Sequence, residues 1–237
     1  MTTPHLFDRY PYETSVKLDN FEKFVRRQAL TRFLVRYELF RQILEVKGSI
    51  LECGVHQGGG LMAWAKLSAG LEPMALHRRV IGFDTFEGFP GLHAKDQETA
   101  RQHDGLRPGF FAPVHDCYEE LKECVADFDA NRFLNQFPKV ELVKGDALQT
   151  IPAYLENNPH LLVALLFLDF DLYEPTRVAL KTFLPRMPKG AIVAFDEINN
   201  PHWPGETMAL VESLGGSVGS VALRKFPFDP NIAYLVL

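Results

Sequence analysis

From residue 49 onward, short apolar runs alternate with longer segments in which apolar residues recur every three to four positions. The short runs are typical of strands and the longer segments are typical of helices. The predicted strands are SILECGV, RRVIGFD, KVELVKGD, LLVALLFLDFD and GAIVAFDE, with two short ones near 217–226 and 231–237. Because strands that alternate with helices form βαβ units, the sequence predicts an α/β fold. We expect a doubly wound, mainly parallel seven-stranded sheet with helices on both faces.

A segment of different character precedes this alternation. Residues 1–18 show no periodicity, and we expect an irregular arm there. The next four residues resemble a capping box, with Asp19 at the cap and Glu22 three residues later. Apolar residues then recur at helical spacing from Phe21 to Leu44, which predicts one long helix.

Arginines fill much of the space between the apolar residues of this helix. They are Arg26, Arg27, Arg32, Arg36 and Arg41. Such a pattern is typical of a solvated helix face. We therefore divide the chain into an N-terminal arm and helix, residues 1–47, and a main domain, residues 48–237. The first part is expected to act as a cover or a subunit contact.

The first predicted strand ends in a glycine-rich stretch, ECGVHQGGG, which runs from Glu52 to Gly60. Glycines let the backbone turn sharply and come close to a ligand. The spacing E-x-G-x-x-x-G differs from the dinucleotide fingerprint G-x-G-x-x-G. The stretch is either a ligand-binding loop or a tight turn, and its place between a strand and a helix favours ligand binding.

Acidic residues end the next two strands. Asp84 follows the second strand, 24 residues after Gly60. A carboxylate at that place can accept hydrogen bonds from both hydroxyls of a ribose, although it could instead cap a helix. Asp146 ends the third strand and either contacts an adenine edge or caps the next helix.

Four carboxylates follow the two most apolar strands: Asp169, Asp171, Asp196 and Glu197. The carboxyl ends of parallel strands meet at one edge of a sheet, and anions packed together there repel each other. A hard divalent cation with oxygen ligands, Mg²⁺, Ca²⁺ or Mn²⁺, resolves that conflict. The alternative is a set of helix caps and salt bridges. We favour the metal because few cationic residues are nearby in the sequence.

Composition excludes several other classes of protein. The chain has 237 residues, of which 46% are hydrophobic, and a net charge of −5, so it is neither largely disordered nor rich in the basic residues of a nucleic-acid binder. Its longest apolar run is eight residues, whereas a membrane helix needs about 18. The N-terminus lacks the pattern of a signal peptide. Three unpatterned cysteines favour a reduced, cytoplasmic location. We expect no nucleic-acid partner and no membrane.

Taken together, the strand-end motifs resemble the macrocin O-methyltransferase family of class I S-adenosylmethionine-dependent methyltransferases. The motifs are LECGVHQGG, GFDTFEGFP, VKGD, LDFDLYEPT, GAIVAFDE and WPGET, which span roughly residues 46–212. The resemblance implies a Rossmann-like domain that moves a methyl group from S-adenosylmethionine to a small-molecule hydroxyl. The implied acceptor is a deoxysugar in a natural-product glycoside or sugar nucleotide. Mg²⁺ is the implied metal, with Mn²⁺ or Ca²⁺ in its place, and a homo-oligomer is expected.

The same resemblance assigns roles to residues. Those implied in binding S-adenosylmethionine are Glu52, Gly54, Val55, Gly58, Gly59, Asp84, Thr85, Asp146, Ala147 and Asp169. Glu52, Gly54 and Gly58 would line its methionine part, and Asp84 would hold its ribose. Asp169, Asp196 and Glu197 would carry the metal. The family usually has two aspartates where this chain has Asp196 and Glu197, and the longer glutamate puts the metal geometry in doubt.

Asp171 would be the general base that accepts the proton of the substrate hydroxyl. It lies two residues after Asp169, so both side chains share a face while strand geometry persists. Otherwise Asp171 caps the helix that begins near Pro175, or ligates the metal itself, and His202 becomes the next candidate for the base. Trp203 is either a core residue or a wall for the substrate. Residues 86–134 match the family least and are expected to face the acceptor.

Three alternative functions remain open at this stage. A catechol-type O-methyltransferase keeps the chemistry and changes the acceptor. An NAD-type oxidoreductase would explain the glycine loop and Asp84, but neither the acidic cluster nor the absence of G-x-G-x-x-G. A catalytically inactive binding module is disfavoured, because an acidic residue is present at every expected strand end.

Overall fold

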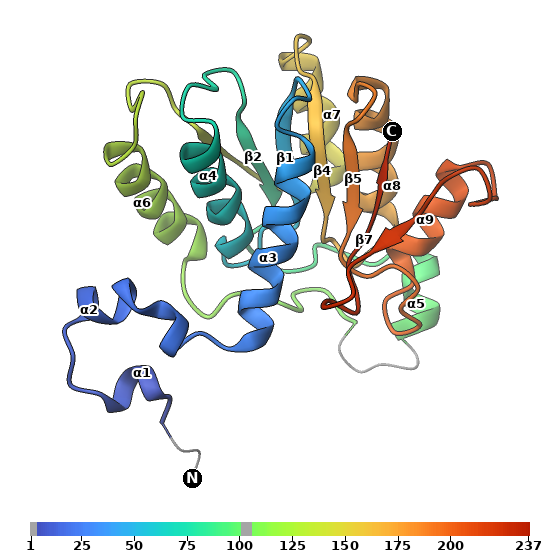
Figure 1. Ribbon diagram of the computed structural model, residues 1–237. Helices are drawn as coiled ribbons and strands as arrows, with labels where there is room; N and C mark the ends of the chain where they lie inside the picture. The colour runs from blue at the N-terminus through green and yellow to red at the C-terminus, as the bar shows by residue number, and fades with distance from the viewer. Residues whose placement is uncertain (1–3, 101–105) are drawn as a thin grey trace.

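The computed structural model describes residues 4–100 and 106–237. Within them, seven strands form one sheet in the order β3-β2-β1-β4-β5-β7-β6 (Figure 1). The strands are β1 (Ser49–Cys53), β2 (Val80–Asp84), β3 (Val140–Lys144), β4 (Val163–Leu168), β5 (Ile192–Phe195), β6 (Arg224–Lys225) and β7 (Ala233–Val236). Neighbouring strands from β3 to β5 are parallel, whereas β7 is antiparallel to both β5 and β6. The predicted mainly parallel α/β sheet is confirmed, although its last two strands are shorter than expected.

Helices cover both faces of the sheet, as the sequence predicts (Figure 1). One face carries α3 (Arg27–Gln42), α4 (Gly59–Leu71) and α6 (Cys117–Ala130), and the other carries α7 (Ala147–Asn157), α8 (Tyr173–Phe183) and α9 (Gly205–Ser213). Two separate hydrophobic cores result. Trp64 packs on Phe167 in the first core, and Phe83 packs on Phe183 in the second. Because both faces are covered, β1, β4 and β5 are buried along their whole length.

The strand order reverses between β1 and β4, from which the chain winds outward in opposite directions. Such a switch point leaves a crevice at the carboxyl ends of the strands, and ligands of open α/β sheets bind there. The insertion after β2 runs along this edge and contains α5 (Ala94–Ala100), at the bottom of Figure 1. The C-terminus lies at the opposite edge.

The N-terminal segment differs from the sequence prediction. The arm is not irregular, because it contains α1 (Leu6–Arg9) and α2 (Thr14–Asp19), followed by the short 3₁₀ helix η1 (Phe21–Lys23). The predicted capping box is wrong, since Asp19 ends α2 and the long helix begins at Arg27. The reason is tertiary packing: the buried ring of Phe24 lies against Phe7 of α1, at 5.5 Å between ring centroids, and does not continue the helix.

Helix α3 is part of the main core. Val35, Leu39 and Phe40 are fully buried against the sheet and α4, so only the residues before α3 project from the body of the protein (Figure 1). No helix in the described part of the chain is long and apolar enough to cross a membrane.

Candidate active site

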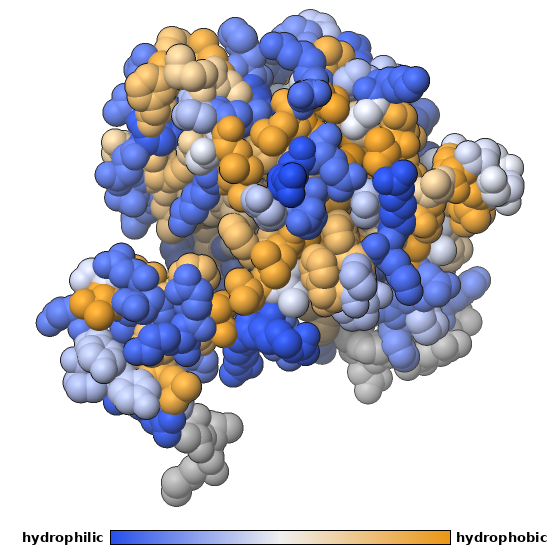
Figure 2. Space-filling model, in the orientation of Figure 1, coloured by the Kyte–Doolittle hydropathy of each residue, from blue (hydrophilic) through white to orange (hydrophobic). Residues whose placement is uncertain are grey.

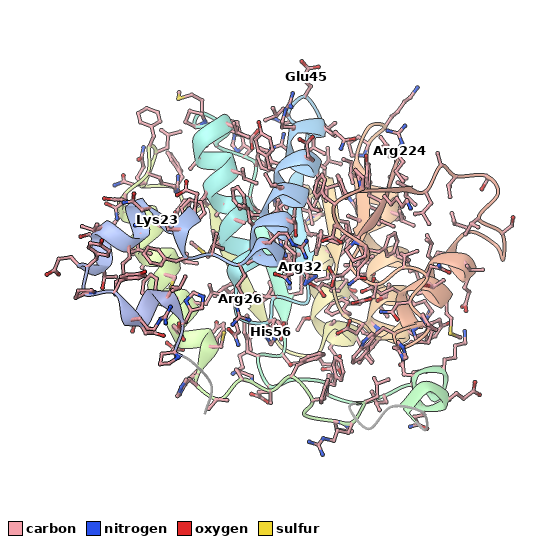
Figure 3. The ribbon with its side chains drawn as sticks, turned by 60° about the horizontal axis from the view of Figure 1, so that its bottom comes forward. Lys23, Arg26, Arg32, Glu45, His56 and Arg224 are labelled. Atoms are coloured by element: carbon pink, nitrogen blue, oxygen red, sulfur yellow. The ribbon has the colours of Figure 1, made fainter. Side chains whose placement is uncertain are left out.

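A cavity of about 630 Å³ opens at the carboxyl edge of the sheet, which Figure 3 turns toward the viewer. Its volume is within the usual range of small-molecule sites. The predicted site residues that line it are Gly54, Asp84, Thr85, Asp146, Ala147, Asp169, Asp171, Asp196 and Glu197. Glu52, Val55, Gly58 and Gly59 lie near the end of β1 but are not part of the lining. The topology therefore brings the glycine loop, the second-strand acid and the acidic cluster to one cavity.

Asp84 fastens the glycine loop to the end of β2. Its Oδ2 accepts hydrogen bonds from the backbone N–H groups of Val55 and His56, at 2.7 and 2.8 Å, and its Oδ1 accepts one from Phe86 at 2.7 Å. These bonds hold the loop, whereas the alternative prediction was a helix cap. A carboxylate offers about four lone-pair sites, so Asp84 keeps acceptor capacity toward the cavity.

Asp146 caps a helix and also lines the cavity. As the N-cap of α7, its side chain accepts a hydrogen bond from the N–H of Leu148 at 2.9 Å. This is one of its two predicted roles. Contact with an adenine edge stays a prediction.

Glu52 points into the protein and binds an arginine. The residue is 1% exposed, and its Oε1 accepts a hydrogen bond from Arg36 Nη2 at 3.2 Å. Gly60 makes this pair possible, because a Cβ at that position would lie 2.0 Å from the same oxygen. Burial raises the pKa of Glu52 to about 7, and Arg36 opposes the rise. Oε2 of Glu52 is buried and accepts no hydrogen bond within the described residues, and the contact with S-adenosylmethionine stays a prediction.

The acidic cluster shows the electrostatic conflict that the sequence suggested. Burial raises the pKa of Asp171 to about 8, and the charges of Asp196 and Glu197 add to the rise. Burial and the charges of Asp196 and Asp171 also hold the pKa of Asp169 well above its usual range. Burial raises the pKa of Glu197. The cluster therefore has a strong tendency to take up a proton or a cation.

An arginine neutralises part of the negative charge of the acidic cluster. Arg32 of α3 lines the cavity and forms an ion pair with the buried carboxylate of Asp196. Figure 3 shows Arg32 near the middle of this view, and His56 lines the same cavity. The interpretation of the arginines as a solvated face is thus wrong for Arg32 and Arg36, which turn inward. Their spacing from the buried Leu39 and Ile43, every three or four residues, puts all four on one side of the helix and is the signal that could have identified them.

The chemistry of the acidic cluster supports the predicted metal, but its side chains do not form a metal site. Oxygen ligands and excess negative charge suit a hard cation. Yet within residues 4–100 and 106–237, no group of three or more His, Cys, Asp or Glu side chains is arranged to hold a metal ion. With Arg32 bound to Asp196, the acids do not enclose one.

Asp171 reaches the cavity by a different geometry from the expected one. Strand β4 ends at Leu168, and Asp171 has a φ of 61°, in the left-handed region. The expectation that strand geometry persists to this residue is therefore wrong. The alternative helix-cap role is not found either, because α8 begins after Leu172 without a side-chain cap.

Aromatic residues close the other side of the cavity. Trp203 lines it together with Phe89 and Phe111 of the insertion, with ring centroids 6.2 and 5.9 Å from Trp203. Trp203 therefore lines the cavity and is not a core residue, and its contact with a substrate stays a prediction. The two phenylalanines were missed because their sequence context carries no periodic signal. Within the predicted acceptor-facing region 86–134, residues 101–105 lie outside the described residues.

Comparisons with known proteins agree with this geometry. A family model described as Macrocin-O-methyltransferase (TylF) matches residues 32–208. A curated relative from Streptomyces olivaceus, 8-demethyl-8-(2,3-dimethoxy-alpha-L-rhamnosyl)-tetracenomycin-C 4'-O-methyltransferase, is 30% identical over 157 residues. The match covers 64% of this chain and 53% of the relative, so the chain spans about half of that protein's length.

Solved structures show the same similarity over nearly the whole chain. The calicheamicin methyltransferase CalS11 is 38% identical with a TM-score of 0.90, over 98% of this chain and 88% of that one. An apo structure of CalS11, described as a TDP-rhamnose 3'-O-methyltransferase, is 35% identical with a TM-score of 0.79, over 98% and 89%. The O-methyltransferase NovP, at 20% identity and a TM-score of 0.65 over 86% and 78%, shares the fold.

Proposed function

This chain belongs to the macrocin O-methyltransferase family, and we propose that it transfers a methyl group from S-adenosylmethionine to a hydroxyl of a deoxysugar. The acceptor would be part of a natural-product glycoside or a sugar nucleotide. The main supporting observation is the single cavity in which Asp84 and its glycine loop face the acids at the ends of β4 and β5. The similarity to CalS11 supports the choice of a sugar as acceptor.

The residues around the cavity suit S-adenosylmethionine. When bound, this cofactor supplies a methyl group that is already activated on a sulfonium. We propose that Asp84 binds a ribose hydroxyl with its remaining acceptor site and that Asp146 and Ala147 lie beside the adenine. Gly54, at the end of β1 in the cavity wall, would lie beside the methionine part.

A divalent cation, Mg²⁺ with Mn²⁺ or Ca²⁺ in its place, is a further part of the proposal. When bound, it would supply Lewis-acid stabilisation to the acceptor oxygen. Asp169, Asp196 and Glu197 would hold it, and Arg32 would first have to release Asp196. Glu197 Oε2 accepts a hydrogen bond from Asn200 Nδ2 at 2.5 Å, and Glu197 would have to give up or shift this bond to hold the metal.

Asp171 is the proposed proton acceptor. Its carboxylate lines the cavity beside Asp169 and would take the proton of the attacking hydroxyl. The aromatic wall of Phe89, Phe111 and Trp203 would pack on the apolar face of the acceptor and exclude water. Holding the two reactants in line supplies much of the remaining acceleration, since well-oriented reactions reach effective molarities on the order of 10⁵–10⁸ M.

The N-terminal segment is proposed to cover the site or to contact another subunit of a homo-oligomer. Its exposed apolar side chains include Leu6, Val16, Leu18 and Phe21, in the projecting part at the lower left of Figure 2. These side chains are spread among hydrophilic ones on the projecting segment, where they are accessible to a second subunit. A cytoplasmic location also stays part of the proposal.

The decisive experiment measures transfer of labelled methyl from S-adenosylmethionine to a panel of acceptors. The panel contains TDP-rhamnose, other sugar nucleotides, rhamnosyl glycosides and catechols. Each is assayed with Mg²⁺, with Mn²⁺ and with excess chelator. We expect transfer to a sugar hydroxyl that the chelator abolishes and added metal restores. Transfer to catechols alone would overturn the proposed acceptor, and full activity in excess chelator would overturn the metal requirement. Binding of NAD without binding of S-adenosylmethionine would overturn the proposed reaction.

A further inference from the structure

Glu206 is a fully buried carboxylate at the start of α9, and its two oxygens bind two different loops of the active site. Oε1 accepts a hydrogen bond from the backbone N–H of Asp171 at 3.3 Å, and Oε2 accepts one from the backbone N–H of Glu197 at 3.0 Å. Asp171 lies in the loop between β4 and α8, and Glu197 lies in the loop between β5 and α9. One side chain therefore joins both loops that carry the acidic cluster.

The preceding residue brings the helix close enough for this contact. A Cβ at Gly205 would lie 2.5 Å from the backbone nitrogen of Tyr173 and 2.6 Å from the carbonyl oxygen of Asp171. A larger residue would push α9 away from the loop, because distances below 3 Å are not tolerated against backbone atoms. Gly205 thus lets α9 pack directly on the backbone beside Asp171, where Glu206 reaches its N–H.

The backbone conformation of Asp171 is one that such a contact stabilises. Non-glycine residues with positive φ are uncommon, and surrounding contacts hold them in that conformation. Asp171 has a φ of 61°, and its N–H is the group that Glu206 binds. The contact fixes the backbone from which the carboxylate of Asp171 enters the cavity.

The chemistry of the side chain also matters. Two N–H donors approach Glu206 from two loops, and a carboxyl group can accept at both of its oxygens. A glutamine of nearly the same size has one acceptor end, and its NH₂ end would face the second donor. Burial and the charges of Asp171 and Asp196 hold the pKa of Glu206 well above its usual range, while the two backbone N–H groups that donate to it oppose that rise.

We propose that Glu206 is a positioning residue. By binding both backbone N–H groups it fixes the loops of Asp171 and Glu197 relative to each other, so that both carboxylates face the same acceptor hydroxyl. The effect on the reaction rests on the proposed function. The link that Glu206 makes between the two loops, called the clamp below, rests on the two hydrogen bonds alone.

The test uses Glu206→Gln in the full chain, with Glu212→Gln on the same helix as the matched control. Glu212 is exposed and binds Lys95 and the hydroxyl of Tyr173. Amide hydrogen exchange is measured at Asp171 and Glu197, and kcat and KM are measured with TDP-rhamnose. We expect Glu206→Gln to accelerate exchange at both amides at least tenfold and to lower kcat by about 10²-fold, the effect of a small misplacement. Binding of S-adenosylhomocysteine should change less than twofold, and the control should behave as the parent.

Several outcomes would overturn the proposal. If amide exchange at both positions is unchanged in a folded Glu206→Gln, Glu206 does not hold the two loops. If exchange is faster but kcat is unchanged, Glu206 is not a positioning residue. If the glutamine variant does not fold, Glu206→Asp keeps two acceptors on a shorter stem and should show the same faster exchange at both amides. If the parent itself transfers no methyl group, the proposed function fails, and the exchange experiment still tests the clamp.

Discussion

Arg32 on α3 and Asp196 at the end of β5 form an ion pair across 164 residues of sequence. The carboxylate is buried and the guanidinium is partly exposed in the cavity wall. A cation from the N-terminal helix therefore lies where the proposed divalent ion would be bound.

Arg32→Gln should tighten the binding of Mn²⁺ about three- to tenfold. The substitution removes a competing cation and leaves the acids more negative, and both effects favour the metal. Partial exposure of Arg32 limits the size of the change. Titration calorimetry with Mn²⁺ measures it, and Arg27→Gln, an exposed residue on the same helix, is the control. Weaker or unchanged Mn²⁺ binding would contradict competition at Asp196.

Asp84→Ala should weaken binding of S-adenosylmethionine about 10- to 100-fold. The variant loses the acceptors for three backbone N–H groups as well as the proposed ribose contact, and hydrogen bonds to a charged group contribute about 1.5–3 kcal/mol. Calorimetry gives the affinity. Asp116→Ala removes the cap of α6, a comparable bond outside the cavity, and should bind as the parent does. An affinity for Asp84→Ala equal to that of the control argues against the assignment.

Asp171→Asn should lower kcat by about 10²–10⁴ and leave cofactor binding nearly intact. The substitution keeps the size of the side chain and removes the proton acceptor. Steady-state kinetics and calorimetry separate the two effects, with the exposed Asp127→Asn as control. Rescue by excess metal would instead make Asp171 a metal ligand. Turnover near the parent rate would place the base elsewhere, with His202 as the next candidate.

Glu52 should make the folded protein less stable as the pH rises from 5 to 8. Its pKa is about 7 in the folded chain, against an ordinary value of 4.5. Between these values the folded chain keeps a proton that the unfolded chain has lost. The free energy of unfolding therefore falls through this range, by up to about 3 kcal/mol, and the loss is complete above pH 7.

Thermal unfolding of the parent and of Glu52→Gln across this pH range checks the prediction. The parent should lose more stability than the variant, which has no titrating group at that position. Glu141→Gln is the control, because that carboxylate also pairs with an arginine but is partly exposed at 36%. Parallel profiles for the parent and Glu52→Gln would show that Glu52 stays ionised throughout.

The sequence by itself determined the sheet, its flanking helices and the edge that carries the chemistry. Periodicity identifies each element locally, and a polar residue directly after a buried strand must lie at the carboxyl edge. For this reason Asp84, Asp146, Asp169 and Asp196 could be assigned to one crevice before any contact was known.

Only the tertiary structure decided which charges meet there. Arg32 and Arg36 pair with the buried carboxylates of Asp196 and Glu52 because α3 packs across the sheet, and no local pattern encodes that packing. The left-handed Asp171 and its contact with Glu206 likewise depend on the packing of α9, 35 residues away. Periodicity reports which side of an element is buried, whereas the partner of a buried charge is set by the elements that the fold brings against it.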